Sequence, residues 1–332
     1  MKTITRVVLS CSLAAGLAAP ALAHHSAAAY NTRENMTITG TVTEYRFRNP
    51  HVFMTVQVKN ADGSTSSVEV EAGAASVLGP LGFTRDAVAV GDVVTIAGNP
   101  ARNAADKSML GRELTKKDGT YYPLNIASRS IYAANAVTAT SIAGTWVSPS
   151  LGGFRVPPAD VTDKGKAEMA KAGPTTTTQK DCVPIGEPSV MFYPVANTIT
   201  VAKDRVTLKV DWMDTERVVY LDGRQHPPAA QTFLHGHSTG KWEGDTLVIE
   251  TTNFKEHGSG LSTSLPSSTQ KKLIERLRLA PDGKNLLYFG TVEDPVYLVK
   301  PVDWNGRWEY RPTMQHSNEK CDLDVARKFL KQ

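Results

Sequence analysis

The chain has 332 residues, 41% of them hydrophobic, and a formal net charge of +4. Its charges are scattered, without the basic run or aromatic-interleaved basic stripe of nucleic-acid-binding proteins, which argues against nucleic acid as a partner. At about 100–200 residues per domain, this length predicts two domains, each with its own core.

The first 23 residues have the features of a secretory signal peptide. Lys2 and Arg6 form a positive start, an apolar stretch follows, and residues 21–23 (ALA) fit the small-x-small cleavage pattern. The apolar stretch is shorter than the ~20 residues that a membrane span needs, and no later stretch comes closer. We therefore expect cleavage after Ala23 and a periplasmic or secreted mature chain without a membrane span.

Two cysteines remain once this segment is removed. In an oxidising compartment an even pair predicts a disulfide, here between Cys182 and Cys321. The bond would tie the start of the second domain to its end. By closing a long loop, it would contribute about 3–5 kcal/mol to stability.

Residues 24–120 predict a small β domain. The segments MTITGTVTEYRFR, HVFMTVQV and SSVEVEA alternate apolar and polar residues, a weakly helical AGAASVLGPLG follows, and VGDVVTIAGNP and MLGRELTKKDG complete the series. Five short strands with one helical insertion indicate an OB-like small barrel. The stacking aromatics and cationic groove of OB-folds that bind nucleic acid are not evident.

After a linker at residues 121–140, residues 141–332 predict a second and larger β domain. Roughly eight to ten strands, separated by Asp-Gly, Gly-Asp and Pro turns, indicate a meandering antiparallel barrel or sandwich. At the head of the series, Gly144-Thr145-Trp146 resembles the Gly-x-Trp signature of lipocalins. The resemblance implies a lipocalin-like barrel with a cup for a small apolar ligand, and Trp146 packed under Arg307 or Arg276.

Cleavage after Ala23 would create a metal-binding terminus. The α-amine and the imidazole of His24 could chelate one ion, and His25 or His51 could supply a third nitrogen, which is the arrangement called a histidine brace. Such nitrogen ligands favour copper or zinc, and binding would weaken in acid as the ligands take up protons. The alternative is a frayed terminus whose histidines bind nothing.

Two further resemblances concern uncharacterised secreted bacterial proteins. The pattern HHS…Y…ITGTVTEYRFRNPHVF…GDVVTIAGNP resembles one such family, which implies that His24, His25, Ser26, Asn49 and His51 belong together. The elements LDGR-x-HP, GHS-x-G-x-WEGDTLV and ER…EDP, within about residues 216–300, resemble a second set. Neither resemblance brings a known activity.

The second of these patterns contains the candidate site of the barrel. His235 and His237, at i and i+2 on an expected strand, would point to one face and could share a metal or a substrate, and His226 could join them across a hairpin. Carboxylates that could orient a histidine or act as acid or base are Glu243, Glu275 and Asp294. The expected catalytic residues are His235, His237 and Glu243, and the expected ligand-binding residues are Arg224, His226, Trp242, Glu275 and Asp294.

A purely structural alternative is a set of buried ion pairs between Arg224 or Arg276 and Glu275, Glu243 or Asp294. The GHSTG stretch matches the Gly-x-Ser-x-Gly spacing of serine hydrolases, but a turn and a strand follow it instead of a helix, so that class is not expected.

Together these features predict an exported two-domain binding protein for a metal ion, a small apolar molecule or both. One alternative is an enzyme of lyase, isomerase or hydrolase type that acts on a small apolar or aromatic compound in the second barrel. The other is an envelope scaffold with no site.

Overall fold

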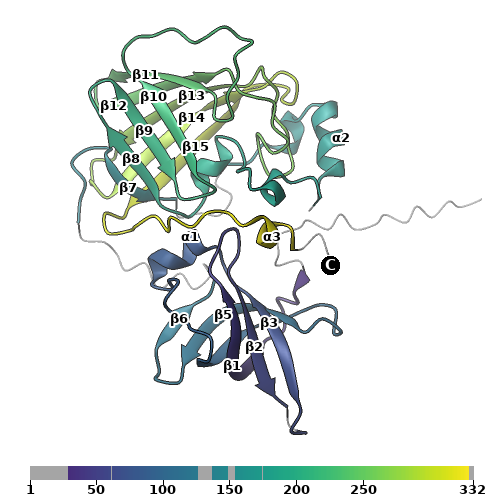
Figure 1. The fold of residues 1–332 in the computed structure, drawn as a ribbon. Coiled ribbons are helices and arrows are strands. Elements are labelled where there is room, and N and C mark those ends of the chain that lie inside the picture. The colour runs from purple at the N-terminus through teal and green to yellow at the C-terminus, as the bar shows by residue number, and fades with distance from the viewer. Residues whose placement is uncertain (1–28, 61, 126–136, 149–153, 174, 329–332) are drawn as a thin grey trace, which may run out of the picture.

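The structure is a computed structural model and describes residues 29–60, 62–125, 137–148, 154–173 and 175–328. It is mainly β, with one barrel in each half of the chain and a separate hydrophobic core in each barrel. Figure 1 shows the N-terminal barrel in purple and blue and the C-terminal barrel in green. His24 and His25 lie outside the described residues.

The N-terminal barrel has the OB-like arrangement that the strand pattern predicts. Its elements are β1 (Met36–Arg46), β2 (Phe53–Lys59), β3 (Thr65–Glu71), α1 (Ala75–Leu78), η2 (Gly79–Leu81), β4 (Val93–Pro100), β5 (Ser108–Lys116) and β6 (Tyr121–Pro123). The strands follow the order β3-β2-β1-β4-β5, and a parallel β3–β5 pairing closes the sheet. Inward-facing Val42, Val56, Val70 and Ile96 are fully buried and form the middle of its core.

The C-terminal barrel has nine strands. They are β7 (Gly144–Val147), β8 (Asn197–Val201), β9 (Arg205–Val210), β10 (Thr215–Tyr220), β11 (His237–Glu243), β12 (Thr246–Thr252), β13 (Lys272–Leu279), β14 (Asn285–Glu293) and β15 (Val302–Tyr310). The predicted closed barrel is confirmed. The meander is interrupted once, because β10 and β11 are parallel neighbours. Parallel neighbours cannot be joined by a tight hairpin, so residues 221–236 form a long crossing connection between them.

Two long connections cover one end of this barrel, which we call the capped end. The first, between β7 and β8, carries η4 (Pro158–Asp160), α2 (Asp163–Lys171), η5 (Thr178–Asp181) and η6 (Ser189–Phe192). The second is the β12–β13 connection, residues 253–271. They are joined by hydrogen bonds from Gly186 N to Ser259 O, 2.9 Å, and from Ser189 Oγ to Leu261 O, 2.5 Å.

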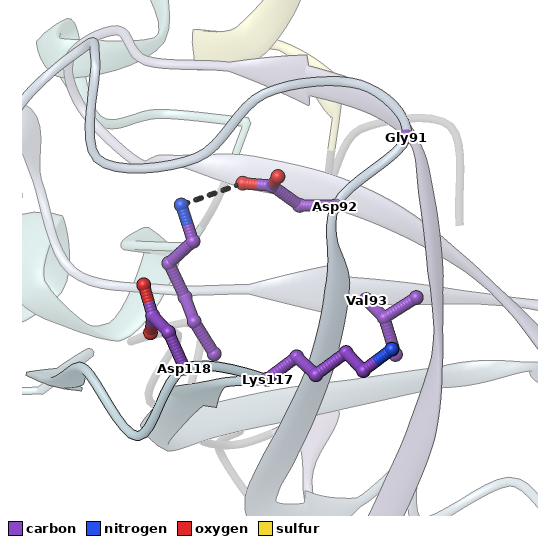
Figure 2. A pocket seen from close by; sticks show the side chains of 6 residues that line it. Gly91, Asp92, Val93, Lys117 and Asp118 are labelled. Carbon is purple, nitrogen blue, oxygen red and sulfur yellow. Dashed lines mark ion pairs between the residues drawn. The ribbon is translucent and has the colours of Figure 1, made fainter.

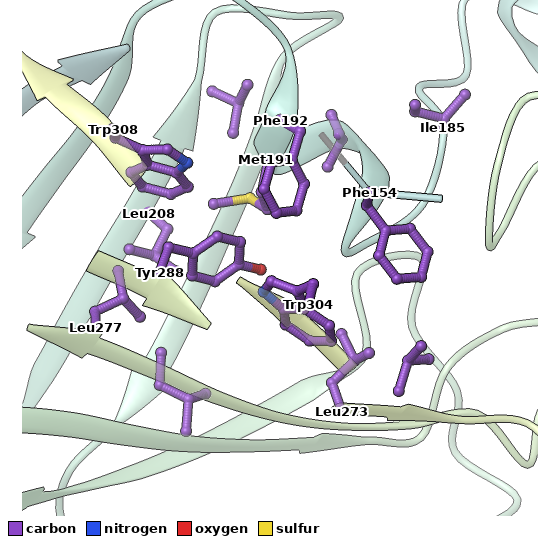
Figure 3. Packing of buried hydrophobic residues seen from close by; sticks show 14 of the residues in the cluster. Phe154, Ile185, Met191, Phe192, Leu208, Leu273, Leu277, Tyr288, Trp304 and Trp308 are labelled. Carbon is purple, nitrogen blue, oxygen red and sulfur yellow. The ribbon is translucent and has the colours of Figure 1, made fainter. Parts of the chain in front are cut away.

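Large aromatic side chains fill much of the barrel interior. Tyr288 packs against Trp308 at 4.8 Å between ring centroids and against Phe192 of the cap at 5.4 Å. In Figure 3 these rings, together with Trp304 and Met191, occupy the space between the strands and the cap. The apolar body of this end is therefore built from the protein's own side chains.

Trp146 is buried at the first strand of this barrel, but not under an arginine. Its ring packs on Tyr310 at 4.9 Å, and its Nε1 donates to Ile142 O at 2.9 Å. Arg276 and Arg307 alternate with the inward-facing residues of β13 and β15, so both point outward. The expectation that one of them covers Trp146 is wrong.

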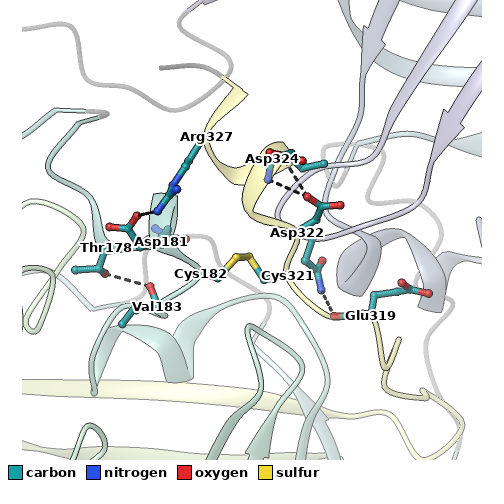
Figure 4. The surroundings of a disulfide bond; sticks show 12 residues. Thr178, Asp181, Cys182, Val183, Glu319, Cys321, Asp322, Asp324 and Arg327 are labelled. Atoms are coloured by element: carbon teal, nitrogen blue, oxygen red, sulfur yellow. Dashed lines mark hydrogen bonds and ion pairs between the residues drawn. A yellow bond between two sulfur atoms is a disulfide. The ribbon is translucent and has the colours of Figure 1, made fainter. Parts of the chain in front are cut away.

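The C-terminal segment lies between the two barrels and binds both. The Cys182–Cys321 disulfide predicted from the sequence is confirmed and ties this segment, next to α3 (Leu323–Ala326), to the cap of the C-terminal barrel (Figure 4). On its other side, buried Asn49 donates from Nδ2 to Glu319 O at 2.9 Å, and Asp322 N donates to Asn49 O at 3.1 Å.

None of the helices in the described ranges is long and apolar enough to cross a membrane.

Candidate functional site

The expected common face of His235 and His237 is not formed. β11 begins at His237, and Gly236 before it has a positive φ of 68°, which breaks the strand alternation. His235 therefore turns toward the cap, whereas His237 lies on the outer wall of the barrel. The structure separates the predicted residues into an inner and an outer group.

The inner group is a polar cluster at the capped end, formed by Glu187, His235, His257 and Lys271; we call it the cap cluster. His235 Nδ1 lies 2.8 Å from Oε1 of Glu187, whose side chain is fully buried, while the His235 side chain keeps 18% exposure. Lys271 is also buried and donates from Nζ to Glu187 O at 3.2 Å and to Gly260 O at 3.0 Å. Its ammonium lies 4.1 Å from the ring centroid of Phe254.

The environment of the cap cluster shifts the pKa values of three of its groups. Burial alone would raise the pKa of Glu187, but the hydrogen bond to His235, together with the charges of Arg217 and Lys271, prevails and lowers it to about 2. Burial lowers the pKa of Lys271 to about 8, although Glu187 and Asp294 oppose the change. Burial, with repulsion from Lys271, lowers the pKa of His257 to about 4. At neutral pH the cluster thus contains an ionised Glu187 and a neutral His257.

Several buried polar atoms of this region have no hydrogen-bond partner among the described residues. They include Glu187 Oε2, Ser267 Oγ and Arg217 Nε. Because Ser259 N donates to Nδ1 of His257 at 2.9 Å, neutral His257 carries its proton on Nε2, on the side of the backbone carbonyl of Pro184. Buried polar groups are normally paired, so these three atoms are exceptions within the cap region.

Glu275 and Asp294 lie near the cap cluster but already have partners. Glu275 is fully buried and accepts from Arg217 at 2.6 and 2.9 Å and from Tyr288 Oη at 2.7 Å. The expected ion pair of Glu275 with Arg224 or Arg276 is therefore wrong: Glu275 does form a buried ion pair, but its partner is Arg217. Asp294 accepts from the backbone N and Oγ of Ser268 and holds the β12–β13 connection in place.

The outer group lies on the wall formed by β10, β11 and β12. His226 Nδ1 and His237 Nδ1 are 2.9 Å apart, so His226 does join His237. His237 stacks on Tyr220 with ring centroids 5.3 Å apart, and Cζ of Arg224 lies 3.7 Å from the centroid of the same Tyr220 ring. Arg224 is also bound by Asp222, which fixes it beside this group.

Glu243 and Trp242 belong to neither group. They lie at the opposite end of β11, where Glu243 is exposed and pairs with Lys241 at 2.7 Å, and Trp242 is 43% exposed. The Glu-Gly-Asp turn that follows places them at a hairpin tip.

His51 in the N-terminal barrel is held by a backbone carbonyl and lies beside a carboxylate. Its Nδ1 forms a hydrogen bond with Ala72 O at 3.3 Å and lies 3.2 Å from Glu71 Oε1, which favours the proton on Nδ1 and leaves the lone pair on Nε2. Tyr30 Oη donates to the other oxygen of Glu71 at 2.9 Å. The first described residues of the chain are thus anchored beside His51.

This part of the chain matches a protein-family model. Residues 13–110 match a family of unknown function, DUF6152. The match spans β1 to β4 and the start of β5, and it is consistent with the resemblance of this region to an uncharacterised family. No curated protein matches the chain.

Other features of the described residues give no additional candidate. No group of three or more His, Cys, Asp or Glu side chains in the described ranges could hold a metal ion. A hollow on the N-terminal barrel is lined by residues 91–93 and 116–118 (Figure 2), and Lys116 Nζ lies 2.9 Å from Asp92 Oδ2. These two charges satisfy each other, and the hollow contains none of the predicted residues.

Sequence reasoning missed Glu187, Lys271, His257, Arg217 and Glu71. The first three lie on the two long connections, where no strand or helix period indicates which way a side chain points. Arg217 could have been found, because the alternation of β10 places it between inward-facing Thr215 and Val219.

Proposed function

We propose that the chain is an exported, periplasmic or secreted binding protein whose C-terminal barrel binds a small molecule at the capped end. The observation that carries this proposal is the set of unpartnered buried atoms beneath His235. The only cap-cluster histidine with notable exposure is His235, so it marks the side from which a ligand would reach them.

The chemistry of the free atoms indicates the ligand class. Glu187 Oε2 is an acceptor, and Ser267 Oγ can donate or accept, so a hydroxyl group, which also donates and accepts, can satisfy both atoms. The surrounding side chains are largely apolar and aromatic. A small apolar or aromatic compound with a hydroxyl group fits this environment best.

Phenol and toluene form a matched pair of probes, because they have nearly the same size and only phenol has a hydroxyl. We expect millimolar phenol to raise the melting temperature of the mature protein more than toluene does. In Glu187→Gln the amide oxygen would face His235 and the NH₂ group would replace the acceptor Oε2, so the advantage of phenol should disappear. Glu243→Gln is the matched control and should keep it; equal effects of both probes on the wild type would contradict the proposal.

An enzyme is the second candidate, and the His235–Glu187 pair favours it. An ionised carboxylate that holds Nδ1–H leaves the lone pair on His235 Nε2, which is the arrangement of a general base. If this imidazole is reactive, the protein should hydrolyse p-nitrophenyl acetate, and His235→Gln should reduce the rate at least tenfold. His51→Gln controls for unspecific imidazole reactivity, and equal rates in both variants would reject the enzyme proposal.

We also propose that copper or zinc binds at the N-terminus of the mature chain. The α-amine and the imidazole of His24 would supply two nitrogens, and His51 or His25 would supply the third. Support comes from the hydrogen bond of His51 Nδ1 with Ala72 O, since metal-ligating histidines usually donate their other N–H to a carboxylate or carbonyl. His24 precedes the anchored Tyr30 by six residues, a reach of up to about 20 Å.

Intact mass spectrometry of untagged protein from the periplasm tests this metal site together with export. We expect a chain that begins at His24 and retains one ion, and His51→Ala or His24→Ala should lose it. A chain that begins at another residue would remove the chemical basis of the chelate.

A further inference from the structure

The outer group on the C-terminal barrel contains two histidines that share an unusual geometry. His226, from the crossing connection, and His237, the first residue of β11, place their Nδ1 atoms 2.9 Å apart with the rings nearly perpendicular, 77°. We propose that these two nitrogens bind one divalent copper or zinc ion in place of the proton that they share in the metal-free protein. This site is separate from the N-terminal site proposed above.

The distance between the two nitrogens fits a metal ion. With metal–nitrogen bonds of about 2.0–2.1 Å, two nitrogens 2.9 Å apart subtend an angle of about 90° at the ion. That angle suits two adjacent ligands of tetragonal copper, and a widening of a few tenths of an ångström reaches the tetrahedral angle of zinc.

The neighbours of His226 prepare its Nδ1 as a ligand. Its Nε2 lies 3.3 Å from Thr239 Oγ1 and 3.4 Å from Glu250 Oε1. Glu250 also pairs through its other oxygen with Lys272, 2.7 Å away. An acceptor on this side favours the proton on Nε2 and leaves the Nδ1 lone pair for a metal, as in carboxylate–histidine–metal arrangements.

The second histidine is fixed by its aromatic neighbours. His237 is stacked on Tyr220 with an interplanar angle of 25°, and the ring centroid of Phe233 lies 6.2 Å from that of His237. These contacts hold the ring of His237 beside His226, so the two nitrogens are already close together before a metal binds.

The remaining coordination positions would be filled by water or by an external ligand. The side chain of His226 is 21% exposed, so the pair is accessible from solvent. Two protein ligands give weaker binding than a closed structural site with four, and an open position is the feature that lets a bound ion contact a further molecule.

Calorimetric titration of the untagged mature protein with Zn²⁺, and electron paramagnetic resonance with Cu²⁺, test the inference. We expect His226→Gln and His237→Gln each to lose one metal equivalent and the nitrogen couplings of the two rings. Glutamine keeps a polar side chain of similar length, and circular dichroism checks that the barrel remains folded. Glu250→Gln should keep the stoichiometry and weaken binding by about tenfold.

His51→Ala separates this site from the N-terminal one. It should remove a different equivalent and leave the signal of the His226–His237 site unchanged. If both glutamine variants bind as many equivalents as the wild type with the same affinity, the pair shares only a proton and the inference is overturned, whatever the result at His51.

Discussion

At the scale of single residues, Glu275 shows how the barrel interior accommodates a charge. Arg217 binds it with two hydrogen bonds and Tyr288 with a third, and all three side chains are buried. Removing one member of such a pair is costly because it leaves an uncompensated charge, whereas removing both is often tolerated.

Glu275→Gln should therefore lower the free energy of unfolding by about 3–5 kcal/mol, because Arg217 would lose its counter-charge. The double variant Arg217→Met/Glu275→Gln should lose less than either single variant, since glutamine can still accept from Tyr288. Urea denaturation measures these values, with the exposed Glu243→Gln as an unaffected control. Additive losses in the double variant would show that the pair is not a unit.

The buried His257 makes stability depend on pH. The pKa of His257 is about 4 in the folded chain, compared with the ordinary value of 6.5 in the unfolded chain. Between pH 4 and pH 6.5 the unfolded chain therefore binds more protons than the folded chain. The contribution of neutral His257 to the free energy of unfolding is therefore complete above pH 6.5 and is lost as the pH falls toward 4.

The difference in unfolding free energy between the wild type and His257→Gln should therefore shrink between pH 7 and pH 4.5. Urea denaturation at a series of pH values measures it. Asp211, whose pKa burial raises to about 6, titrates in the same range but contributes equally to both proteins and cancels in the difference. A difference that does not change with pH would mean that His257 has the same pKa in the folded and the unfolded chain.

At the scale of elements, Gly236 decides which way its two neighbours, His235 and His237, point. It has a positive φ, and a Cβ there would lie 2.6 Å from Thr251 Cγ2 and 2.7 Å from Thr252 O. The prediction that His235 and His237 share one face of a strand is wrong because of this residue. Side chains alternate between faces only within a strand, and β11 begins at His237. The turn glycine Gly244, by contrast, was correctly read from Glu-Gly-Asp.

Gly236→Ala should cost about 2–4 kcal/mol, since it combines an unfavourable φ with a clash against backbone. It should also displace His235 from Glu187, which a change in the NMR signals of the His235 ring would detect. Gly244→Ala is the matched control: it has a similar φ of 62° but open space around it, and should cost only about 1–2 kcal/mol. Equal losses in the two variants would contradict the role of the clash.

At the scale of the molecule, strand periodicity was enough to predict two β-barrels, and cysteine number was enough to predict the disulfide. The cap cluster was not predictable, because Glu187 and Lys271 are 84 residues apart and meet only where two aperiodic connections cover the same barrel end. The Asn-Pro-His stretch was interpreted as a turn and a metal ligand. In the structure its asparagine joins the two barrels, and no local pattern indicates a partner near residue 319.

The contacts of Asn49 lead to a prediction about how the two barrels unfold. Asn49 Oδ1 accepts from Ser76 N and Oγ at 3.2 Å, while Nδ2 holds the backbone of Glu319, so the side chain links α1 to the C-terminal segment. The disulfide pins the same segment to the other barrel and closes a loop of 139 residues, worth about 5 kcal/mol against the unfolded chain. We expect one calorimetric unfolding transition for the wild type, because each barrel stabilises the segment on which the other depends.

Asn49→Ala leaves Glu319 O and Ser76 without their partner and should split this transition in two, with the N-terminal barrel melting first. The double variant Cys182→Ser/Cys321→Ser interrupts the same connection from the other side, so it should also produce two transitions, with the larger loss in the C-terminal barrel. Hydrogen exchange at β2 and β13 reports which barrel opens in each case. If Asn49→Ala keeps a single transition while the cysteine variant splits it, the bond and not the asparagine couples the barrels.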